Sequence, residues 1–335
     1  MEIIIRRSRL PVIPSNLLRL IDCGPGRVVN TRPALSTANL RMYSEDKTER
    51  SSMSPHNQQV IEYFDQTHND YRRLWGIDRH LGLHCGFFDK AHRRHDAAVT
   101  NMNRVLAAMA GISPGDRVLD AGCGIGGSAI WLAENINGTH VSGVNINEMQ
   151  ITLANNQARQ RDVQSLVQFH VADFAQTGFA DQTFDVVWAL ESMCYTDDKQ
   201  VFLDEAFRLL KPGGRLIIAD GFLTRDDLGP QERKIVERWC RGWAIPNVLT
   251  VRRFQQQLGE AGFRKVQFRD VTQHVTPSSR RIYIASLLFY PLGMLLYWAG
   301  LRNEIQTQGI ASGYYQYVAR KRGLGVYGIC CARKA

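Results

Sequence analysis

The residues with the clearest chemical potential form a glycine-rich turn after a short apolar run. Asp120 is followed by Gly122, Gly124, Gly126 and Gly127 within the segment 118–127. Glycines allow the backbone to turn sharply and to approach a ligand closely. The lysine and hydroxyl pair of a phosphate loop does not follow them. The turn therefore predicts a ligand site at a strand end, with Asp120 as its charged group.

Polar side chains also follow the next apolar segments of the chain. Asn145 and Gln150 come after the segment 140–145, Asp173 and Phe174 after 166–171, and Glu191 after 184–190. Each of these groups stands at the end of a predicted strand, as Asp120 does.

A second group of candidate residues precedes the glycine-rich turn and is aromatic. It contains Tyr63, Tyr71, Trp75 and His84, and Tyr195 joins it from the segment after the fourth predicted strand. Aromatic side chains can stabilise a cation through the faces of their rings. A single buried ring more often belongs to a core, so only the group as a whole points to a site.

The elements that must position these residues alternate between strand and helix patterns. Strands are predicted at 117–121, 140–145, 166–171, 184–190, 214–220, 264–271 and 325–333, and helices at 54–75, 91–110, 127–136, 147–161, 198–211, 230–243 and 251–262. This alternation is typical of an α/β, doubly wound, mostly parallel sheet. We expect seven strands, with the last one antiparallel.

Four parts of the chain are distinguished by composition. They are a basic leader at 1–52, an N-terminal helical cap at 53–112, a core at 113–272, and an apolar helical lid with the last strand at 273–335. The leader is rich in arginine and contains four prolines, which suits an organelle transit peptide. A start of translation at Met53 is the other interpretation, and neither makes the leader part of the fold.

Charge and cysteine content exclude several classes of protein. The formal net charge is +9, but residues 1–43 of the leader carry +5 of it and the rest of the chain is nearly balanced, so a nucleic-acid partner is not expected. The seven cysteines contain no C-x-x-C pair, and neither a metal site nor a disulfide scaffold is predicted. A reduced, cytoplasmic location is the expectation, with organelle import as the alternative.

The motifs together resemble those of the class I S-adenosylmethionine-dependent methyltransferases over about residues 54–334. The resemblance implies that S-adenosylmethionine is the cofactor and that Asp120, Gly122, Gly124 and Gly126 lie at its methionine end. Asn145 and Gln150 would then serve the ribose, Asp173 and Phe174 the adenine, and Glu191 either the cofactor or the reaction. Asn145 departs from the acid that many members have. The Asn-rich turn with Gln150, and the aromatic region before Asp120, are similar to those of sterol side-chain and tocopherol methyltransferases.

The segment 282–301 contains no charged residue. Its length reaches that of a membrane-spanning helix, but it lies between the last two predicted strands, where a span is hard to place. A lid over an apolar pocket that touches a bilayer surface is the expectation. A pair of ordinary packing helices is the alternative.

These features predict methyl transfer to a carbon atom of an apolar isoprenoid, such as a terpenoid, a sterol or a prenyl diphosphate, through a carbocation. Tyr63, Tyr71, Trp75 and Tyr195 would stabilise the cation, and Glu191 or His84 would accept the proton. A diphosphate acceptor would in addition require Mg²⁺. Three alternatives stay open: methylation of a tocopherol-like ring, O- or N-methylation of a small natural product, and a non-catalytic S-adenosylmethionine-binding protein. The oligomeric state is not predicted.

Overall fold

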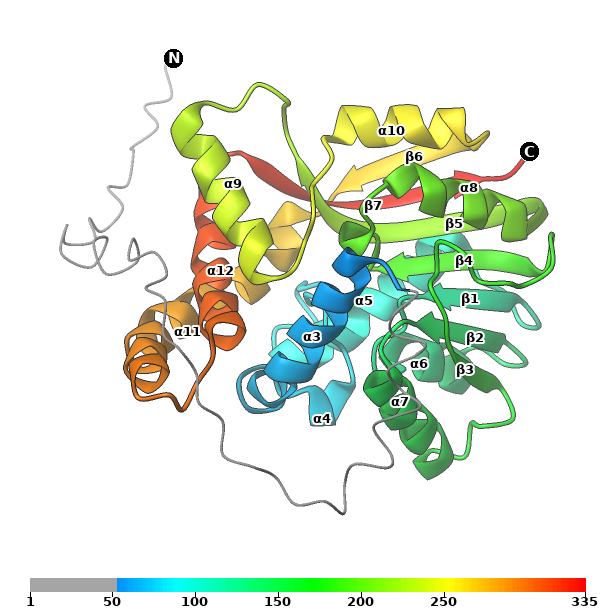
Figure 1. Ribbon diagram of the computed structural model, residues 1–335. Helices are drawn as coiled ribbons and strands as arrows, with labels where there is room; N and C mark the ends of the chain where they lie inside the picture. The colour runs from blue at the N-terminus through cyan, green and yellow to red at the C-terminus, as the bar shows by residue number, and fades with distance from the viewer. Residues whose placement is uncertain (1–52) are drawn as a thin grey trace. The chain divides into compact units, whose positions relative to one another are not determined.

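All seven predicted strands form, and they join in one sheet in the order β3-β2-β1-β4-β5-β7-β6 (Figure 1). Their bounds are β1 Arg117–Ala121, β2 His140–Asn145, β3 Val167–Val171, β4 Phe184–Leu190, β5 Leu210–Leu223, β6 Arg264–Asp270 and β7 Gly325–Arg333. The computed structural model describes residues 53–335. The expectations for the leader 1–52 lie outside the described residues.

The order of the strands confirms a doubly wound, mostly parallel sheet. Strand β1 pairs in parallel with β2 on one side and with β4 on the other. Strand β7 lies between β5 and β6 and is antiparallel to both, as predicted for the last strand. The chain reverses its direction of winding between β1 and β4. Ligands of such sheets bind outside the carboxyl ends of the strands at that switch point.

The central strand β4 shows why the sheet is buried on both faces. Val187 and Ala189 belong to the core on one face, while Val186, Trp188 and Leu190 belong to the core on the other. Successive side chains of a strand alternate between faces, so a continuous apolar run requires a cover on each side. Helices pack against both faces of the sheet.

The helices occupy most of the predicted positions. Their bounds are α3 Pro55–Asp70, α4 Ile77–His80, α5 His95–Ala110, α6 Gly127–Asn135, α7 Glu148–Gln160, α8 Lys199–Leu209, α9 Pro230–Gly242, α10 Val251–Glu260, α11 Thr272–Trp298 and α12 Glu304–Lys321. A short 3₁₀ turn covers Met193–Tyr195. Helix α3 lies across the carboxyl edge of the sheet, as Figure 1 shows.

Two helices have bounds that differ from the predicted ones. The helix predicted at 91–110 begins only at His95, because the Asp89 side chain accepts the N–H groups of Ala91 and His92 and holds that segment in a turn. The helix predicted at 54–75 is α-helical only to Asp70, and its last turn widens into a π-helical turn. Such wide turns are frequent at functional sites.

The predicted apolar insertion forms two helices, α11 and α12. Helix α11 begins ten residues before the charge-free segment and continues through Pro277 and Pro291. Each proline leaves a carbonyl of the preceding turn without its N–H partner. Both prolines are exposed, so water can reach the carbonyls on that side of the helix.

We expect the glycine at the crossing of α9 and α12 to be required for stability. A Cβ atom at Gly242 would overlap the Ser312 side chain and the Gln308 backbone, whereas one at Gly259 would meet no atom. Gly242→Ala should lower the free energy of unfolding by about 1–3 kcal/mol. The control Gly259→Ala should leave it unchanged or raise it by about 0.5–1 kcal/mol. Urea unfolding measures both, and equal effects would contradict the assignment.

Candidate active site

The glycine-rich turn leaves β1 and enters α6 at the switch point of the sheet. Gly122, Gly124 and Gly126 all have left-handed backbone angles, with φ of 80°, 55° and 87°. A Cβ atom at Gly122 would overlap Ser192, which follows β4 and donates a hydrogen bond to the Ala121 carbonyl oxygen (2.6 Å). Glycine is therefore required there by both conformation and space.

Asp120 is buried with one carboxyl oxygen, Oδ2, that has no partner among the described residues. The side chain is 2% exposed. Burial raises its pKa to about 7, and a hydrogen bond from the Ala129 backbone at the start of α6 acts in the opposite direction. A buried acceptor without a partner is costly. The arrangement suits a bound ligand that brings a donor or a positive charge to Oδ2.

The predicted pair Asn145 and Gln150 is brought together after β2. Asn145 Nδ2 donates to Gln150 Oε1 (2.6 Å), and the Asn147 side chain accepts the Gln150 backbone N–H (2.9 Å). Asn147 also donates to Asp65 on α3 (2.8 Å). No local pattern pointed to Asp65, because it lies 82 residues before Asn147.

Asp173 and Phe174 lie after β3, on the same edge. Asp173 accepts the Ala175 backbone N–H (2.8 Å) and the Asn57 side-chain amide (2.8 Å). Phe174 packs edge-on against Phe202 with the ring centroids 5.2 Å apart. Since Asn57 belongs to α3, this helix contacts both polar groups that follow β2 and β3.

Glu191 joins three separate parts of the chain. Its Oε1 accepts the Cys85 backbone N–H (2.7 Å) and the Tyr327 hydroxyl (2.7 Å). Its own backbone has a φ of 49°, a conformation that residues other than glycine seldom adopt. Burial raises the pKa of the carboxyl group, and the two hydrogen bonds and Arg320 oppose that rise. Sequence reasoning found Glu191 but missed Cys85 and Tyr327.

Asp220 and Lys199 are functional candidates that sequence reasoning missed. Burial raises the pKa of Asp220 to about 7, and Glu191 adds to the rise. Asp220 accepts the Cys194 backbone N–H (2.9 Å), while the buried Lys199 ammonium donates to the carbonyl oxygens of Cys194, Thr196 and Asn247. Together they fix the turn that carries Tyr195. The end of the predicted strand 214–220 could have indicated Asp220.

Three of the predicted aromatic residues lie close to Glu191. The Tyr63 and Tyr71 hydroxyl oxygens are 3.0 Å apart. Phe64 stacks on Tyr71 and meets Tyr195 edge-on. Burial raises the pKa of Tyr71 to about 12, and the Glu191 charge contributes to that rise. Burial also raises the pKa of Tyr195, with Tyr71, Tyr63 and Glu191 among the smaller causes. These hydroxyl groups are therefore neutral.

The other two predicted residues, Trp75 and His84, lie in a neighbouring cluster that also contains His80 and His95. The Trp75 ring packs against His95 at 4.2 Å between centroids. His84 Nδ1 is 3.0 Å from the Cys85 carbonyl oxygen. Burial, with smaller contributions from His80 and His95, lowers the pKa of His84 to about 4, and the hydrogen bond to the Cys85 carbonyl oxygen opposes this shift. A histidine with so low a pKa is a weak base.

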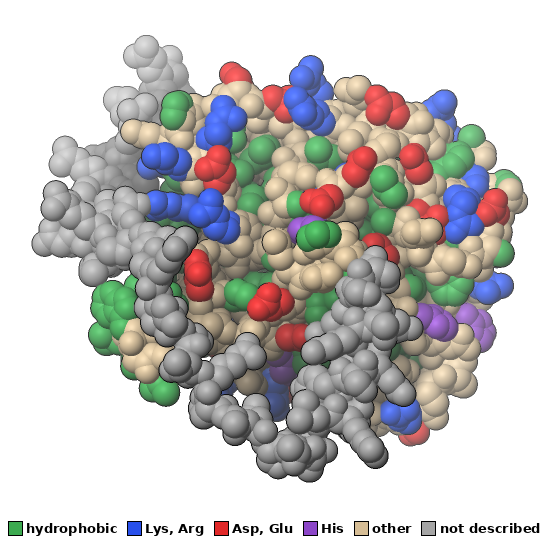
Figure 2. Space-filling view, viewed as in Figure 1, with side chains coloured by type: hydrophobic (Ala, Val, Ile, Leu, Met, Phe, Trp, Pro, Cys, Tyr) green, Lys and Arg blue, Asp and Glu red, His purple; other side chains and the backbone are tan. Residues whose placement is uncertain are grey.

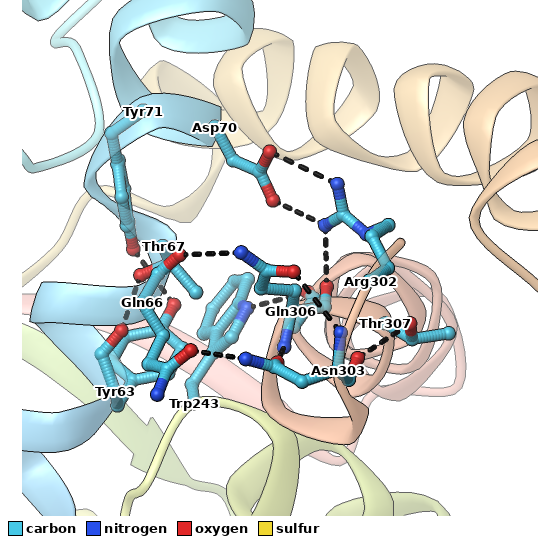
Figure 3. Close-up of polar contacts among 11 residues, drawn as sticks. Tyr63, Gln66, Thr67, Asp70, Tyr71, Trp243, Arg302, Asn303, Gln306 and Thr307 are labelled. Atoms are coloured by element: carbon cyan, nitrogen blue, oxygen red, sulfur yellow. Dashed lines mark hydrogen bonds and ion pairs between the residues drawn. The ribbon is translucent and has the colours of Figure 1, made fainter. Parts of the chain in front are cut away.

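Helix α3 is held over the site by α12, as Figure 3 shows. Arg302 forms an ion pair with Asp70 at the end of α3. Gln306 Nε2 donates to the Gln66 carbonyl oxygen (3.0 Å), and Asn303 donates to the Gln66 side chain. Tyr63 and Tyr71 lie on the same segment, so α12 fixes the position of the aromatic group.

Metal binding has no support in the described part of the chain. No group of three or more His, Cys, Asp and Glu side chains within residues 53–335 is placed to hold a metal ion. The Mg²⁺ that a diphosphate acceptor would require stays a prediction, because such an ion is held by one or two carboxylates together with the phosphate oxygens.

Residues 119–218 match a family profile described as a methyltransferase domain. The chain is 36% identical to the 27-O-demethylrifamycin SV methyltransferase of Amycolatopsis mediterranei (strain S699) over 207 residues, which are 62% of this chain and 74% of that protein. It is 29% identical to the sterol 24-C-methyltransferase of Kluyveromyces lactis, over 68% of this chain and 60% of that protein.

A solved structure supports the fold. A geranyl diphosphate methyltransferase in complex with GPP and sinefungin superposes with a TM-score of 0.66 and 21% identity, over 84% of this chain and 100% of that one. At this identity the likeness concerns the fold alone.

The unpartnered Asp120 carboxyl group should make stability depend on pH. The folded chain holds its proton more tightly than the unfolded chain, because the folded pKa is about 7 and the ordinary value is 3.8. Stability is therefore lost as pH rises through that window. Asp120→Asn should be similar to the unchanged chain near pH 4 and more stable by up to about 4 kcal/mol at pH 8.

Urea unfolding of the ligand-free protein at a series of pH values measures this difference. Glu62→Gln is the matched control, since Glu62 is exposed on α3, and its pH profile should follow that of the unchanged chain. An Asp120→Asn variant that is less stable at pH 8 would show that the charge has a stabilising partner.

Proposed function

We propose that this chain, which belongs to the class I S-adenosylmethionine-dependent methyltransferases, methylates a carbon atom of an apolar isoprenoid acceptor. The observation that carries the proposal is the buried Glu191 carboxyl group, which is held by Cys85 and Tyr327 and whose charge contributes to the raised pKa of Tyr71 and of Tyr195. Relatives that are named as sterol 24-C-methyltransferases support this acceptor class.

The residues at the carboxyl edge fit the cofactor. Asp120 offers a carboxyl oxygen without a partner among the described residues, and the left-handed backbone at Gly122, Gly124 and Gly126 forms the tight turn beside it. We assign these four residues to the methionine end. When bound, S-adenosylmethionine supplies a methyl group on a positively charged sulfur.

The neighbouring strand ends would hold the rest of the cofactor. Asn145 uses one of its two side-chain N–H groups in the hydrogen bond to Gln150 Oε1, and Gln150 uses neither of its own in that bond. Each amide therefore has an N–H to offer to a ribose hydroxyl. Asp173 can accept further hydrogen bonds beside those of Ala175 and Asn57, and Phe174 offers a ring face for the adenine.

Glu191 and the tyrosine rings would handle the charge that develops on the acceptor. The electron pair of an acceptor alkene forms the new bond to the methyl carbon, and the bond from that carbon to sulfur breaks with its electrons going to sulfur. The positive charge then lies on the acceptor, where ring faces and a carboxylate stabilise it. Glu191 Oε2 takes the proton that is lost. We assign the base to Glu191 rather than to His84, whose pKa is about 4.

A second candidate, O-methylation of a hydroxyl acceptor, is favoured by one comparison. The relative from Amycolatopsis, 36% identical, is named for an O-demethyl acceptor. The same carboxyl group would then remove the proton of the hydroxyl group, and no cation would form. The two candidates differ in which atom of the product carries the new methyl group.

We expect label from methyl-labelled S-adenosylmethionine to appear on carbon when the full chain is given an alkene acceptor. A suitable panel contains farnesyl diphosphate, a side-chain-unsaturated sterol, a prenylated phenol and a hydroxylated macrocycle, with mass spectrometry of the products. Label only on oxygen would replace the proposal by the second candidate, and label only on the phenol ring would indicate a tocopherol-like acceptor. Cofactor binding without any label would exclude the acceptor classes of the panel and overturn the proposal.

Replacing the base should separate catalysis from binding. Glu191→Gln keeps an oxygen acceptor for Cys85 and Tyr327 but cannot accept the proton, so kcat should fall by about 10²–10⁴-fold. Tyr71→Phe keeps the ring and should retain most activity. Calorimetry should show unchanged affinity for S-adenosylhomocysteine in both variants.

The pH profile gives an independent check on Glu191. The base must be ionised, and its pKa is raised above the ordinary value. The rate should therefore rise with pH through that raised pKa, and the rise should be absent in the residual activity of Glu191→Gln. An unchanged kcat in Glu191→Gln would exclude Glu191 as the base.

A further inference from the structure

The outer face of α11 and the residues after it expose most of the large apolar side chains found outside the core. Nine of the eleven exposed large hydrophobic residues in the described chain lie between Ile284 and Leu301. Leu288, Leu292, Leu295, Trp298 and Leu301 are 50–75% exposed. Figure 2 shows apolar side chains gathered at the lower left, where Figure 1 places α11. A contiguous apolar surface of this kind marks an interaction site.

The inner face of α11 has the opposite character. Ser286 is buried and its hydroxyl donates to the Ile310 carbonyl oxygen (2.6 Å). Gly293 is buried against Ile310 of α12, and a Cβ atom at Gly313 would overlap Ile282. A helix of a water-soluble domain ordinarily buries its large apolar side chains. In α11 four of the five buried residues are serine or glycine, whereas Leu288, Leu292 and Leu295 are exposed.

Positive charge lies at one end of this surface, and no acid lies along it. The sequence has no Asp or Glu between Asp270 and Glu304. Arg280 is exposed one helical turn before Ile284, so it shares the outer face. Lys321 lies over the Tyr317 ring, which stacks on Tyr283 of α11. Basic residues beside an apolar helix face suit anionic lipid head groups.

We propose that the outer face of α11 binds to the surface of a membrane that contains anionic lipid. The helix would lie in the plane of the interface, with Leu288, Leu292 and Leu295 in the acyl region. Tyr297 and Trp298, whose rings combine an apolar body with a polar tip, would lie near the head groups. The proposal concerns a surface outside the methyl-transfer site and does not depend on the identity of the acceptor.

The start of α11 is anchored in the fold, which favours surface binding over a membrane span. His274 accepts the Phe88 backbone N–H (2.9 Å), and the buried Ser278 hydroxyl accepts that of Gly86 (3.0 Å). Helix α12 returns the chain to β7, next to the strand β6 that precedes α11. Helix α11 is the one helix in the described chain that is long and apolar enough to span a membrane, and 11% of its apolar window is buried.

A second copy of the chain is the other occupant that the test must distinguish. An interface between identical faces would provide no acid for Arg280 from α11 itself, whereas an anionic bilayer provides a negative charge. We therefore favour the bilayer and use the oligomeric state as one readout.

Vesicle flotation of the full chain tests the proposal. The chain should float with mixed phosphatidylcholine and phosphatidylglycerol vesicles. The triple variant Leu288→Gln, Leu295→Gln, Trp298→Gln should lose at least about tenfold in partition coefficient, because three side chains lose their apolar contact. The double variant Val171→Gln, Val201→Gln is the matched control, since these are the two exposed large hydrophobic residues of the described chain that lie outside this surface. It should float like the unchanged chain.

Arg280→Gln should weaken binding to the mixed vesicles and leave binding to pure phosphatidylcholine unchanged. Unchanged S-adenosylhomocysteine affinity in every variant verifies that the fold persists. Equal flotation of the triple variant and the control would overturn the proposal. So would a dimer of the unchanged chain, seen by sedimentation velocity without flotation, that dissociates in the triple variant.

Discussion

The hydrogen bonds to the Glu191 carboxyl group are the constraint on which the rest of the site depends. They join the loop at Cys85, the end of β4 and the antiparallel strand β7, three segments separated by more than a hundred residues. The left-handed backbone at Glu191 has an energetic cost that only a well-determined surrounding can offset. The cap, the sheet and the last strand thus meet at one acid, so that the acid is positioned by all three.

The polar groups around the site belong to two layers with different tasks. Asp120, Asp173 and Asn145 lie on the sheet edge, where strand order places them. Asn57 and Asp65 reach the same edge from α3, and α3 is in turn held by Arg302. The polar groups on the sheet edge and the aromatic group at Tyr71 are therefore coupled through one helix. A displacement of α3 would alter contacts to Asp173 and Asn147 as well as the position of Tyr71.

Residues at strand ends could be predicted from sequence, whereas their long-range partners could not. Apolar runs locate the strands, and the parallel pairing then brings Asp120, Asn145, Asp173 and Glu191 to one edge. The contact between Glu191 and Tyr327 requires β7 to lie beside β5, which no local pattern encodes. The start of the helix at His95 depends on a side-chain turn at Asp89. Helix α11 continues through Pro277 and Pro291 because both lie on its water-exposed side, and sequence alone does not show which side of the helix is exposed.

The three buried carboxyl groups at the carboxyl edge also influence which form of the cofactor the site would bind more tightly. Burial raises the pKa values of Asp120, Glu191 and Asp220, so each is costly to ionise in the empty protein. A positively charged ligand lowers the free-energy cost of ionising these groups, because an opposite charge favours the ionised form. Transfer of the methyl group leaves the cofactor sulfur neutral, so the ionised carboxyl groups are then stabilised less. In the proposed site these buried acids would thus favour the cationic cofactor over its neutral product, and the loss of charge on the sulfur would weaken the binding of the product.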